Sequence, residues 1–259
     1  MLLAIDTGNT ETVFAVFAKD DTLIGEWRIS TKPQRTADEY AVWLTHLMTL
    51  KDINRLDFSA AIISSVVPAT LFNLKKLCRT YFNIDPLIVG ESTVNLGMRV
   101  LIDQPAEVGA DRLVNSIAAY KAYGGPLIIV DFGTATTFDV IDAGGNYRGG
   151  VIAPGVNLSV EALHMAAAKL PRVAITKPDK VIGTNTVGAI QSGVFWGYVS
   201  MIEGMIGRIR SEFGSDLRVV ATGGLAALFE GSIPDFDHVD PNLTLSGLLH
   251  IHRLNGRSQ

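Results

Sequence analysis

Hydrophobic and polar residues recur with two different periods along this chain, and these periods predict strands and helices in a repeating order. Short runs rich in Val, Ile and Leu between Gly, Asp or Asn are typical of strands. Apolar residues spaced three and four positions apart predict amphipathic helices. In the first part of the chain we expect strands at 2–7, 12–19, 23–30, 59–67 and 84–89, and helices at 37–50 and 68–82.

The second part of the chain repeats this order after the break at Gly124-Gly125-Pro126. Strands are expected at 127–131, 137–142, 146–153, 217–221 and near 238–239, and helices at 158–170, at 187–213, in a short stretch ending at 230 and at 242–254. Three strands followed by alternating helices and strands indicate a mixed sheet with helices packed on it. We therefore expect an α/β fold of two similar halves, residues 1–123 and 124–259.

A polar turn between two strands occurs once in each half, at a constant offset of 125 residues. The aligned positions are Asp6 with Asp131, Gly8 with Gly133, Thr12 with Thr137 and Gly25 with Gly150. Each copy follows an apolar run and leads into another β-rich run. Each therefore predicts a strand, a tight turn and a second strand.

These turns have the composition of a phosphate and metal site. Glycine lets the backbone approach a ligand closely, and exposed N–H groups can form an anion-binding concavity. An Asp at the end of the preceding strand can hold a cation, directly or through water. One copy alone would fit an ordinary hairpin equally well. Two copies in register, with Asp6 and Asp131 both retained, favour a pair of turns that grip a polyphosphate and its metal.

A second candidate site is the segment Gly109-Ala110-Asp111-Arg112, which precedes a predicted helix ending near residue 123. Asp111 occupies the position of a helix N-cap, where Asp is common. Alternatively, Asp111 lies at the edge of a cleft, next to an Arg whose planar guanidinium can pair with a ligand carboxylate. The spacing alone leaves both interpretations open.

Small residues mark two further places where close approach is possible. The first half of the long helix at 187–213 carries a stripe that could contact a second copy of the chain or pack internally: Gly188, Ala189, Ser192, Gly193 and Gly197. The pair Gly223-Gly224 either lets a flat ligand ring lie on the backbone or forms a plain strand-to-helix turn.

Composition narrows the class of protein. The chain has 259 residues, 47% hydrophobic and 19% charged, so a large core is expected. A net charge of −4 without a basic block argues against a nucleic-acid partner. No apolar run approaches the length of about 18 residues that a membrane span needs. The single cysteine, Cys78, and the absence of a signal-peptide pattern predict a cytoplasmic protein.

Five motifs together give the chain a resemblance to type III pantothenate kinases over nearly its whole length. They are Asp6-Thr7-Gly8-Asn9-Thr10, Gly109-Ala110-Asp111-Arg112, the run 131–137, Gly183-Thr184-Asn185-Thr186 and Thr222-Gly223-Gly224. The first and third are shared with the wider superfamily of acetate and sugar kinases, Hsp70 and actin. The resemblance implies a duplicated actin-like, ribonuclease H-like fold with a nucleotide cleft between its halves.

The resemblance also implies an activity. This is transfer of the γ-phosphoryl group of ATP to the terminal hydroxyl of pantothenate, giving 4'-phosphopantothenate, the first step of coenzyme A biosynthesis. It implies Mg²⁺, a monovalent cation (K⁺ or NH₄⁺), and a homodimer with substrate at or near the subunit interface. Two alternatives are a nucleotide-binding regulatory protein of the same fold without kinase turnover and a kinase for another small hydroxylated acid.

Residue roles follow from the resemblance, position by position. On the nucleotide side, Asp6 is implied as the Mg²⁺–ATP carboxylate, Asp131 as the monovalent-cation ligand, and the phosphate contacts as Thr7, Gly8, Asn9, Thr10 and Thr134. On the substrate side, Asp111 is implied as the general base, Arg112 as an anchor, Gly109 and Ala110 as backbone contacts, and Thr186 as a contact that reaches into the neighbouring subunit's site. Family members often carry an aromatic residue where this chain has Ile102, which puts one hydroxyl contact to pantothenate in question.

Overall fold

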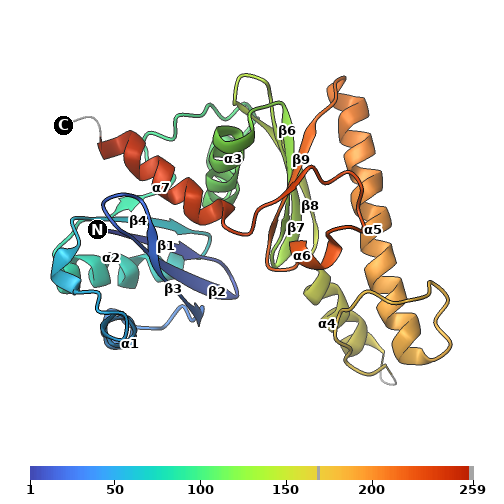
Figure 1. The fold of residues 1–259 in the computed structure, drawn as a ribbon, viewed down its shortest axis with the longest axis horizontal. Helices are drawn as coiled ribbons and strands as arrows, with labels where there is room; N and C mark the ends of the chain where they lie inside the picture. The colour runs from blue at the N-terminus through green and yellow to red at the C-terminus, as the bar shows by residue number, and fades with distance from the viewer. Residues whose placement is uncertain (168–169, 257–259) are drawn as a thin grey trace. The chain divides into compact units, whose positions relative to one another are not determined.

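The computed structural model describes residues 1–167 and 170–256, which form two compact units (Figure 1). One unit comprises Met1–Lys121 together with the chain from Leu243 onward, and the other comprises Ala122–Asn242. Each unit is built on a five-stranded sheet. The duplicated α/β architecture expected from the sequence is therefore confirmed.

The first sheet has the order β3-β2-β1-β4-β5. Its strands are β1 (Leu2–Thr7), β2 (Glu11–Phe17), β3 (Leu23–Ser30), β4 (Ala60–Ser65) and β5 (Leu87–Ile88). The first three strands are antiparallel neighbours, whereas β4 runs parallel to β1 and β5 parallel to β4. The carboxyl ends of β1 and β4 therefore meet at one edge, and this edge carries Asp6.

The second sheet repeats this topology in the order β10-β9-β6-β7-β8. Its strands are β6 (Leu127–Phe132), β7 (Ala135–Ile141), β8 (Tyr147–Pro154), β9 (Arg218–Gly223) and β10 (His238–Val239). The strands β6, β7 and β8 form the antiparallel part, and β9 is parallel to β6. Asp131 thus occupies in the second sheet the place that Asp6 has in the first.

The residue offset between the halves is not constant. Asp6 pairs with Val13, but Asp131 pairs with Thr137, so the second turn is one residue shorter. The offset falls from 125 in the first strands to 124 afterwards, as the equivalence of Val16 and Val140 shows. The structural equivalents are Thr12 with Thr136 and Gly25 with Gly149, in place of Thr137 and Gly150.

The helices cover the sheets on defined faces. They are α1 (Ala37–Thr49), α2 (Pro68–Phe82), α3 (Ala110–Tyr123), α4 (Val156–Ala166), α5 (Thr186–Phe213), α6 (Ala226–Phe229) and α7 (Leu243–Gly256), with short 3₁₀ turns at Arg55–Asp57 and Pro105–Glu107. The helix expected at 158–170 lies earlier, at α4, and residues 168–169 of that expectation lie outside the described residues. Among the described helices, none is long and apolar enough to span a membrane.

The last helix packs in the first unit, although the sequence pattern assigned residues 124–259 to the second half. Leu245, Leu248 and Ile251 of α7 share a core cluster with Leu2 and Ile62 of the first sheet. Burial of this apolar helix face against the sheet removes it from water. A single boundary at residue 124 cannot describe this packing, because α7 contacts strands that are far away in the sequence.

The two faces of the first sheet have different covers. Alternate β1 residues Leu3 and Ile5 pack with α1 and α2, whereas Leu2 and Ala4 pack with α3 and α7. Side chains of a strand point to alternate faces, so Asp6 continues the row of Leu2 and Ala4. Asp6 therefore lies on the face that α3 and α7 cover, and α3 begins with the predicted substrate motif.

Candidate active site

The first turn, formed by Gly8, Asn9 and Thr10, is held by hydrogen bonds from both of its flanks. The N–H of Gly8 donates to the carbonyl of Glu11 at 3.0 Å. Thr31, just after β3, donates its hydroxyl to the carbonyl of Gly8 at 2.8 Å and its N–H to the carbonyl of Thr10 at 2.9 Å. Asn9 and Thr10 remain exposed. The braced turn thus presents two polar residues to solvent.

Thr7 connects this turn to the neighbouring parallel strand. Its side chain is buried, and its carbonyl accepts the N–H of Val66 at 3.0 Å. Of the residues expected around the phosphates in the first half, Gly8, Asn9 and Thr10 form the turn itself. Thr7 is the buried last residue of β1 and connects the turn to the segment after β4.

The second turn, formed by Gly133 and Thr134, is supported by direct backbone packing. The N–H of Gly133 donates to the carbonyl of Ala135 at 3.0 Å. Gly155, just after β8, occupies the place that Thr31 has in the first half. A Cβ at Gly155 would lie 2.2 Å from the carbonyl oxygen of Thr134 and 2.8 Å from that of Gly133. Only glycine permits this approach, so the shape of the second turn depends on Gly155.

Asp6 has a buried carboxylate oxygen that lacks a partner. Its Oδ1 makes no hydrogen bond within the described part of the chain. Burial raises the pKa of Asp6 to about 7, and the charge of Asp111 acts in the same direction, whereas Ser64 and Arg28 favour the ionised form. A hard oxygen without a partner fits a divalent cation such as Mg²⁺, which takes one or two carboxylates together with phosphate oxygens.

Asp111 lies one residue inside helix α3, so the capping interpretation does not describe its position. The N–H of Leu113 donates to the carbonyl of Gly109 at 3.2 Å, which places the helix cap at Gly109. The Oδ1 of Asp111 accepts the N–H of Arg112 at 2.7 Å. Burial raises the pKa of the Asp111 carboxyl, while the N–H and the charge of Arg112 oppose that shift.

The absence of a side chain at Gly109 leaves room for this carboxylate. A Cβ at Gly109 would lie 2.7 Å from Oδ1 of Asp111 and 3.4 Å from Cγ1 of Val66, which follows β4. The start of α3 therefore lies against the carboxyl end of β4, the strand that pairs with β1. Four sequence-predicted residues, Asp6, Gly109, Asp111 and Arg112, come together in the first unit. Two neighbouring carboxyl groups with raised pKa values are typical of functional sites.

Asp131 lies against backbone in the second unit. A Cβ on Gly223 would lie 2.4 Å from Oδ1 of Asp131 and 2.6 Å from the nitrogen of Phe132. Gly223 also has φ +90°, a conformation that side chains disfavour. Of the pair Gly223-Gly224, the first therefore makes room for Asp131, whereas a Cβ on Gly224 would meet nothing within 4 Å.

No group of three or more His, Cys, Asp or Glu side chains that could hold a metal ion occurs among residues 1–167 and 170–256. A cation at Asp6 or Asp131 would therefore be held by fewer than three such side chains of the described chain, together with ligand oxygens. That arrangement is typical of Mg²⁺ in phosphoryl-transfer sites.

Thr186 is the first residue of α5 and is exposed. The side chain of the preceding Asn185 caps the helix by accepting the N–H of Gly188 at 2.8 Å. Thr186 lines a groove of about 830 Å³ that the sequence did not reveal. The groove lies between α4 and α5, and its walls include Pro154, Leu163, Ile190, Val194, Tyr198 and Met201. Gly193 and Gly197 of the small-residue stripe also line the groove. This stripe is the feature of the sequence that indicated a place of close approach here.

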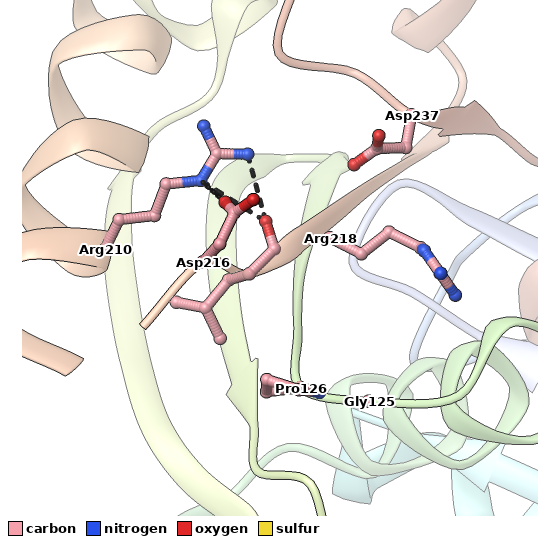
Figure 2. Close-up of a pocket in the computed structure, with 7 residues that line it drawn as sticks. Gly125, Pro126, Arg210, Asp216, Arg218 and Asp237 are labelled. Atoms are coloured by element: carbon pink, nitrogen blue, oxygen red, sulfur yellow. Dashed lines mark hydrogen bonds and ion pairs between the residues drawn. The ribbon is translucent and has the colours of Figure 1, made fainter. Parts of the chain in front are cut away.

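Another pocket, of about 330 Å³, is separate from these residues (Figure 2). It lies where β6 and β9 begin, at the opposite end of these parallel strands from Asp131. Figure 2 shows Arg210 turned toward Asp216, with their ion pair at 3.2 Å. Arg210 also donates to the carbonyl of Leu217 at 3.0 Å. Arg210 is thus paired within the pocket and the sequence-predicted residues lie elsewhere, so we do not assign this pocket to the active site.

Comparison with known proteins identifies the family. The model of type III pantothenate kinases matches residues 2–208. A type III pantothenate kinase from Paramagnetospirillum magneticum is 65% identical over 255 residues, which are 98% of this chain and 98% of the relative. A second one, from Rhodospirillum rubrum, is 59% identical over 98% of this chain and 99% of its own length.

Solved structures with low identity share the fold. The activator of 2-hydroxyisocaproyl-CoA dehydratase from Clostridium difficile, with bound ADPNP, has a TM-score of 0.56 at 14% identity and covers 100% of this chain and 96% of its own. This likeness, with the two matching sheets, confirms the expected actin-like α/β fold. Since the family model covers most of the chain and the relatives match it nearly end to end, the chain belongs to the type III pantothenate kinase family.

Proposed function

We propose that this pantothenate kinase transfers the γ-phosphoryl group of ATP to the terminal hydroxyl of pantothenate with Asp111 as the general base. The observation that carries this proposal is the pair of carboxylates, Asp6 and Asp111, on one face of the first sheet, where burial and, to a smaller extent, the charge of Asp111 raise the pKa of Asp6. Phosphoryl transfer needs positioning and charge neutralisation more than covalent help from the protein. The site needs one carboxylate for the nucleotide and one for the attacking hydroxyl.

On the nucleotide side, Asp6 would hold Mg²⁺, and the turn of Gly8, Asn9 and Thr10 would contact the phosphates. Mg²⁺ held there would neutralise the charge that develops on the phosphoryl group during transfer. The buried, unpartnered Oδ1 of Asp6 among the described residues supports this assignment. Thr134 in the second turn would supply a further phosphate contact.

On the substrate side, the ionised Asp111 would accept the proton of the pantothenate hydroxyl as its oxygen bonds to the γ-phosphorus. The bond from this phosphorus to the β-phosphate oxygen would break, and ADP would leave. The raised pKa of Asp111 makes it a stronger base than an ordinary carboxylate. Arg112, the next residue, would pair with the pantothenate carboxylate through its planar guanidinium. Gly109 and Ala110 would present backbone to the substrate. Ile102, half-buried before the 3₁₀ turn, would contribute an apolar contact to the substrate.

The second unit would supply the monovalent-cation site. Asp131 is the proposed ligand for K⁺ or NH₄⁺. The supporting observation is Gly223, whose missing Cβ lets the carboxylate of Asp131 pack against the backbone at the end of β9 and so fixes its position.

We also propose a homodimer. Exposed apolar residues also occur on the elements that flank the groove between α4 and α5: Ile152 on β8, Leu158 and Met165 on α4, Ile182 just before α5 and Val187 on α5. An apolar groove with exposed apolar residues on its flanking elements is typical of protein interfaces. A second copy of the chain would cover it, and Thr186 at the groove would then reach the substrate of the neighbouring subunit. We also propose a cytoplasmic location, because the reaction consumes ATP.

The test is an assay of ADP release with purified protein, ATP and Mg²⁺, with and without pantothenate, in K⁺ and in Na⁺ buffer. We expect turnover that requires pantothenate and is faster in K⁺. The variant Asp111→Asn should lower kcat by about 100-fold or more, as expected for loss of a general base. Its unfolding temperature should stay close to that of the parent protein.

Two results would oppose the proposal. Asp111→Asn with most of its turnover intact would remove Asp111 from the role of base. Tight nucleotide binding without turnover in any buffer would favour the regulatory alternative. A panel of other small hydroxylated acids, assayed in parallel, tests whether pantothenate is the preferred substrate. This comparison is needed because Arg112 could pair with the carboxylate of any such acid.

A further inference from the structure

The hydroxyl of Thr31 connects the first turn to the buried side of the first sheet. Thr31 donates this hydroxyl to the carbonyl of Gly8 at 2.8 Å. Its oxygen also lies 2.9 Å from the hydroxyl oxygen of Thr12, which is fully buried on β2. A hydroxyl has one proton to donate, and a carbonyl can only accept. The proton of Thr31 therefore goes to Gly8, and Thr12 donates to Thr31.

This chain of two hydrogen bonds sets the direction of one peptide group in the turn. The peptide bond between Gly8 and Asn9 is trans, so its C=O and its N–H point in opposite directions. Because Thr31 binds the C=O, the N–H of Asn9 is turned away from Thr31, and Asn9 is exposed. Exposed backbone N–H groups of a turn can bind an anion such as phosphate. The hydroxyl of Thr31 thus fixes the direction of a donor that a phosphate could use.

The backbone of Thr31 holds the other end of the same turn. Its N–H donates to the carbonyl of Thr10 at 2.9 Å, and the N–H of Gly8 donates to the carbonyl of Glu11 at 3.0 Å. Neither of these bonds uses the side chain of residue 31. A substitution that removes only the hydroxyl therefore leaves the backbone bonds of the turn in place and tests the side chain alone.

The second half lacks this chain of hydroxyls. Thr136 is the structural equivalent of Thr12, and Gly155 is that of Thr31. Gly155 carries no hydroxyl, and the Oγ1 of Thr136 is buried without a hydrogen-bond partner among the described residues. Close packing of the Gly155 backbone shapes the second turn instead. The first turn therefore depends on side-chain hydroxyls in a way that the second does not.

We propose that Thr31 is a positioning residue for nucleotide binding, whose hydroxyl, itself held by Thr12, orients the peptide group between residues 8 and 9 toward the phosphates. This inference rests on the proposed contact between the first turn and the phosphates of ATP. Thr31 itself does not touch the nucleotide. Its substitution should therefore weaken binding of ligands that carry phosphates and leave the KM for pantothenate unchanged.

The first test measures the turn itself, by amide hydrogen exchange in nucleotide-free protein. Thr31→Val keeps the branched shape of the side chain and removes the hydroxyl. The amide of Gly8 should then exchange about fivefold faster or more, as expected for the loss of one hydrogen bond. Thr31→Ser retains the hydroxyl and should exchange at the rate of the parent protein. Should Thr31→Val fold poorly, Thr31→Ala gives the same comparison.

The second test measures the Kd for Mg²⁺–ADP by isothermal titration calorimetry. Thr31→Val should raise this Kd by about fivefold or more, and Thr31→Ser should restore it. Thr12→Val should raise it less, because Thr31 keeps its bond to Gly8. Thr136→Val is the matched control, since it makes the same change at the equivalent position of the second half. There the hydroxyl has no partner within the described chain, so the Kd should stay unchanged.

Kinetics separate positioning from a general loss of structure. In Thr31→Val the KM for ATP should rise with the Kd, while the KM for pantothenate stays unchanged. A variant that only lowers the folded fraction would reduce the apparent kcat and leave both KM values as they are. Adenosine carries no phosphate, so its inhibition constant should be the same in Thr31→Val and in the parent protein.

The outcomes separate this inference from the proposed function. Unchanged exchange at Gly8 in both Thr31→Val and Thr31→Ala would overturn the role of Thr31 and leave the proposed function intact. Faster exchange with unchanged affinity for Mg²⁺–ADP would overturn the proposed contact between the turn and the phosphates. An equal loss of affinity for adenosine, or an equal rise of the Kd in Thr136→Val, would indicate a general disturbance and overturn the specific role of Thr31.

Discussion

The backbone of Gly223 lies so close to the carboxylate of Asp131 that a Cβ would come within 2.4 Å of its Oδ1. The two residues belong to the adjacent parallel strands β6 and β9. Because backbone occupies the position next to the carboxylate, the orientation of Asp131 is coupled to the turn that ends β9. The stability of the second unit and the geometry of the proposed cation site should therefore respond to the same substitution.

Gly223→Ala is predicted to destabilise the protein by about 1–3 kcal/mol, because Ala disfavours φ +90° and its Cβ meets Asp131. Urea unfolding measures this loss. Gly224→Ala is the matched control, since a Cβ there meets nothing within 4 Å. We also expect Gly223→Ala, unlike Gly224→Ala, to weaken activation by K⁺. Equal effects of both substitutions would contradict the proposed coupling.

Gly155→Ala is predicted to weaken ATP binding through the second turn. The new Cβ would lie 2.2 Å from the carbonyl oxygen of Thr134, so the backbone of the turn has to move. We expect an increase of at least about tenfold in the Kd for nucleotide, which corresponds to ~1.4 kcal/mol. Isothermal titration calorimetry checks this value.

A control for Gly155→Ala is Gly207→Ala in the interior of α5, where a Cβ meets nothing within 4 Å. Ala is the better helix former, so this variant should be as stable as the parent protein or more so, with unchanged nucleotide affinity. Normal affinity in Gly155→Ala would show that the second turn does not contact the phosphates.

The raised pKa of Asp6 predicts a pH-dependent contribution to stability. Its folded-state value of about 7 exceeds its ordinary value of 3.8. Between these pH values the folded chain binds a proton that the unfolded chain releases, so this contribution is present in full below pH 3.8 and is lost as the pH rises through about 7. Asp6→Asn cannot ionise and should gain stability relative to the parent protein as the pH rises.

Thermal unfolding of nucleotide-free protein at acid, neutral and alkaline pH checks this prediction. The difference between Asp6→Asn and the parent protein should widen up to about pH 7 and then level off. Asp20→Asn is a control, since the N–H of Thr22 lowers the pKa of this exposed carboxyl. Its contribution to stability is lost only at acid pH, so the difference between Asp20→Asn and the parent protein should stay constant from neutral to alkaline pH. A constant difference across the pH range would show that Asp6 titrates normally.

The sequence predicted the features of the fold that depend on local patterns. The apolar runs before Asp6 and Asp131 define the first strand of each sheet, and the polar residues after them define the turns. Side chains of a strand point to alternate faces, so a few neighbouring residues are enough to recognise a strand. The Asp111 motif was also recognised, although its exact place within the first helical turn was not.

The features that the sequence did not predict depend on contacts between distant residues. The packing of α7 on the first unit includes Gly247, where a Cβ would lie 2.4 Å from the carbonyl oxygen of Val114. The change of offset was hidden because Thr136 and Thr137 are identical in type. The hydrogen bonds from Thr12 through Thr31 to Gly8 join three separate segments, which no local pattern specifies.

The apolar surface around α4 and α5 predicts the oligomeric state. Ile182 and Met165 are 82% and 71% exposed. If a second copy covers them, Asp at either position buries an unpaired charge in the interface, which is unfavourable. Ile182→Asp and Met165→Asp should each weaken the dimer by about 30-fold or more, the effect expected for a residue at the centre of an interface. Light scattering coupled to gel filtration, over a range of protein concentrations, measures the dissociation constant.

The control for this prediction is Phe72→Asp on α2, in the other unit, since Phe72 is 74% exposed. It makes the same change of charge on a similarly exposed apolar residue and should leave the dimer intact. Kinase activity of the two interface variants should fall as the dimer dissociates, because Thr186 would no longer reach the neighbouring site. Full activity in a monomeric Ile182→Asp would mean that each chain completes its own site, and dissociation by Phe72→Asp alone would move the interface to α2.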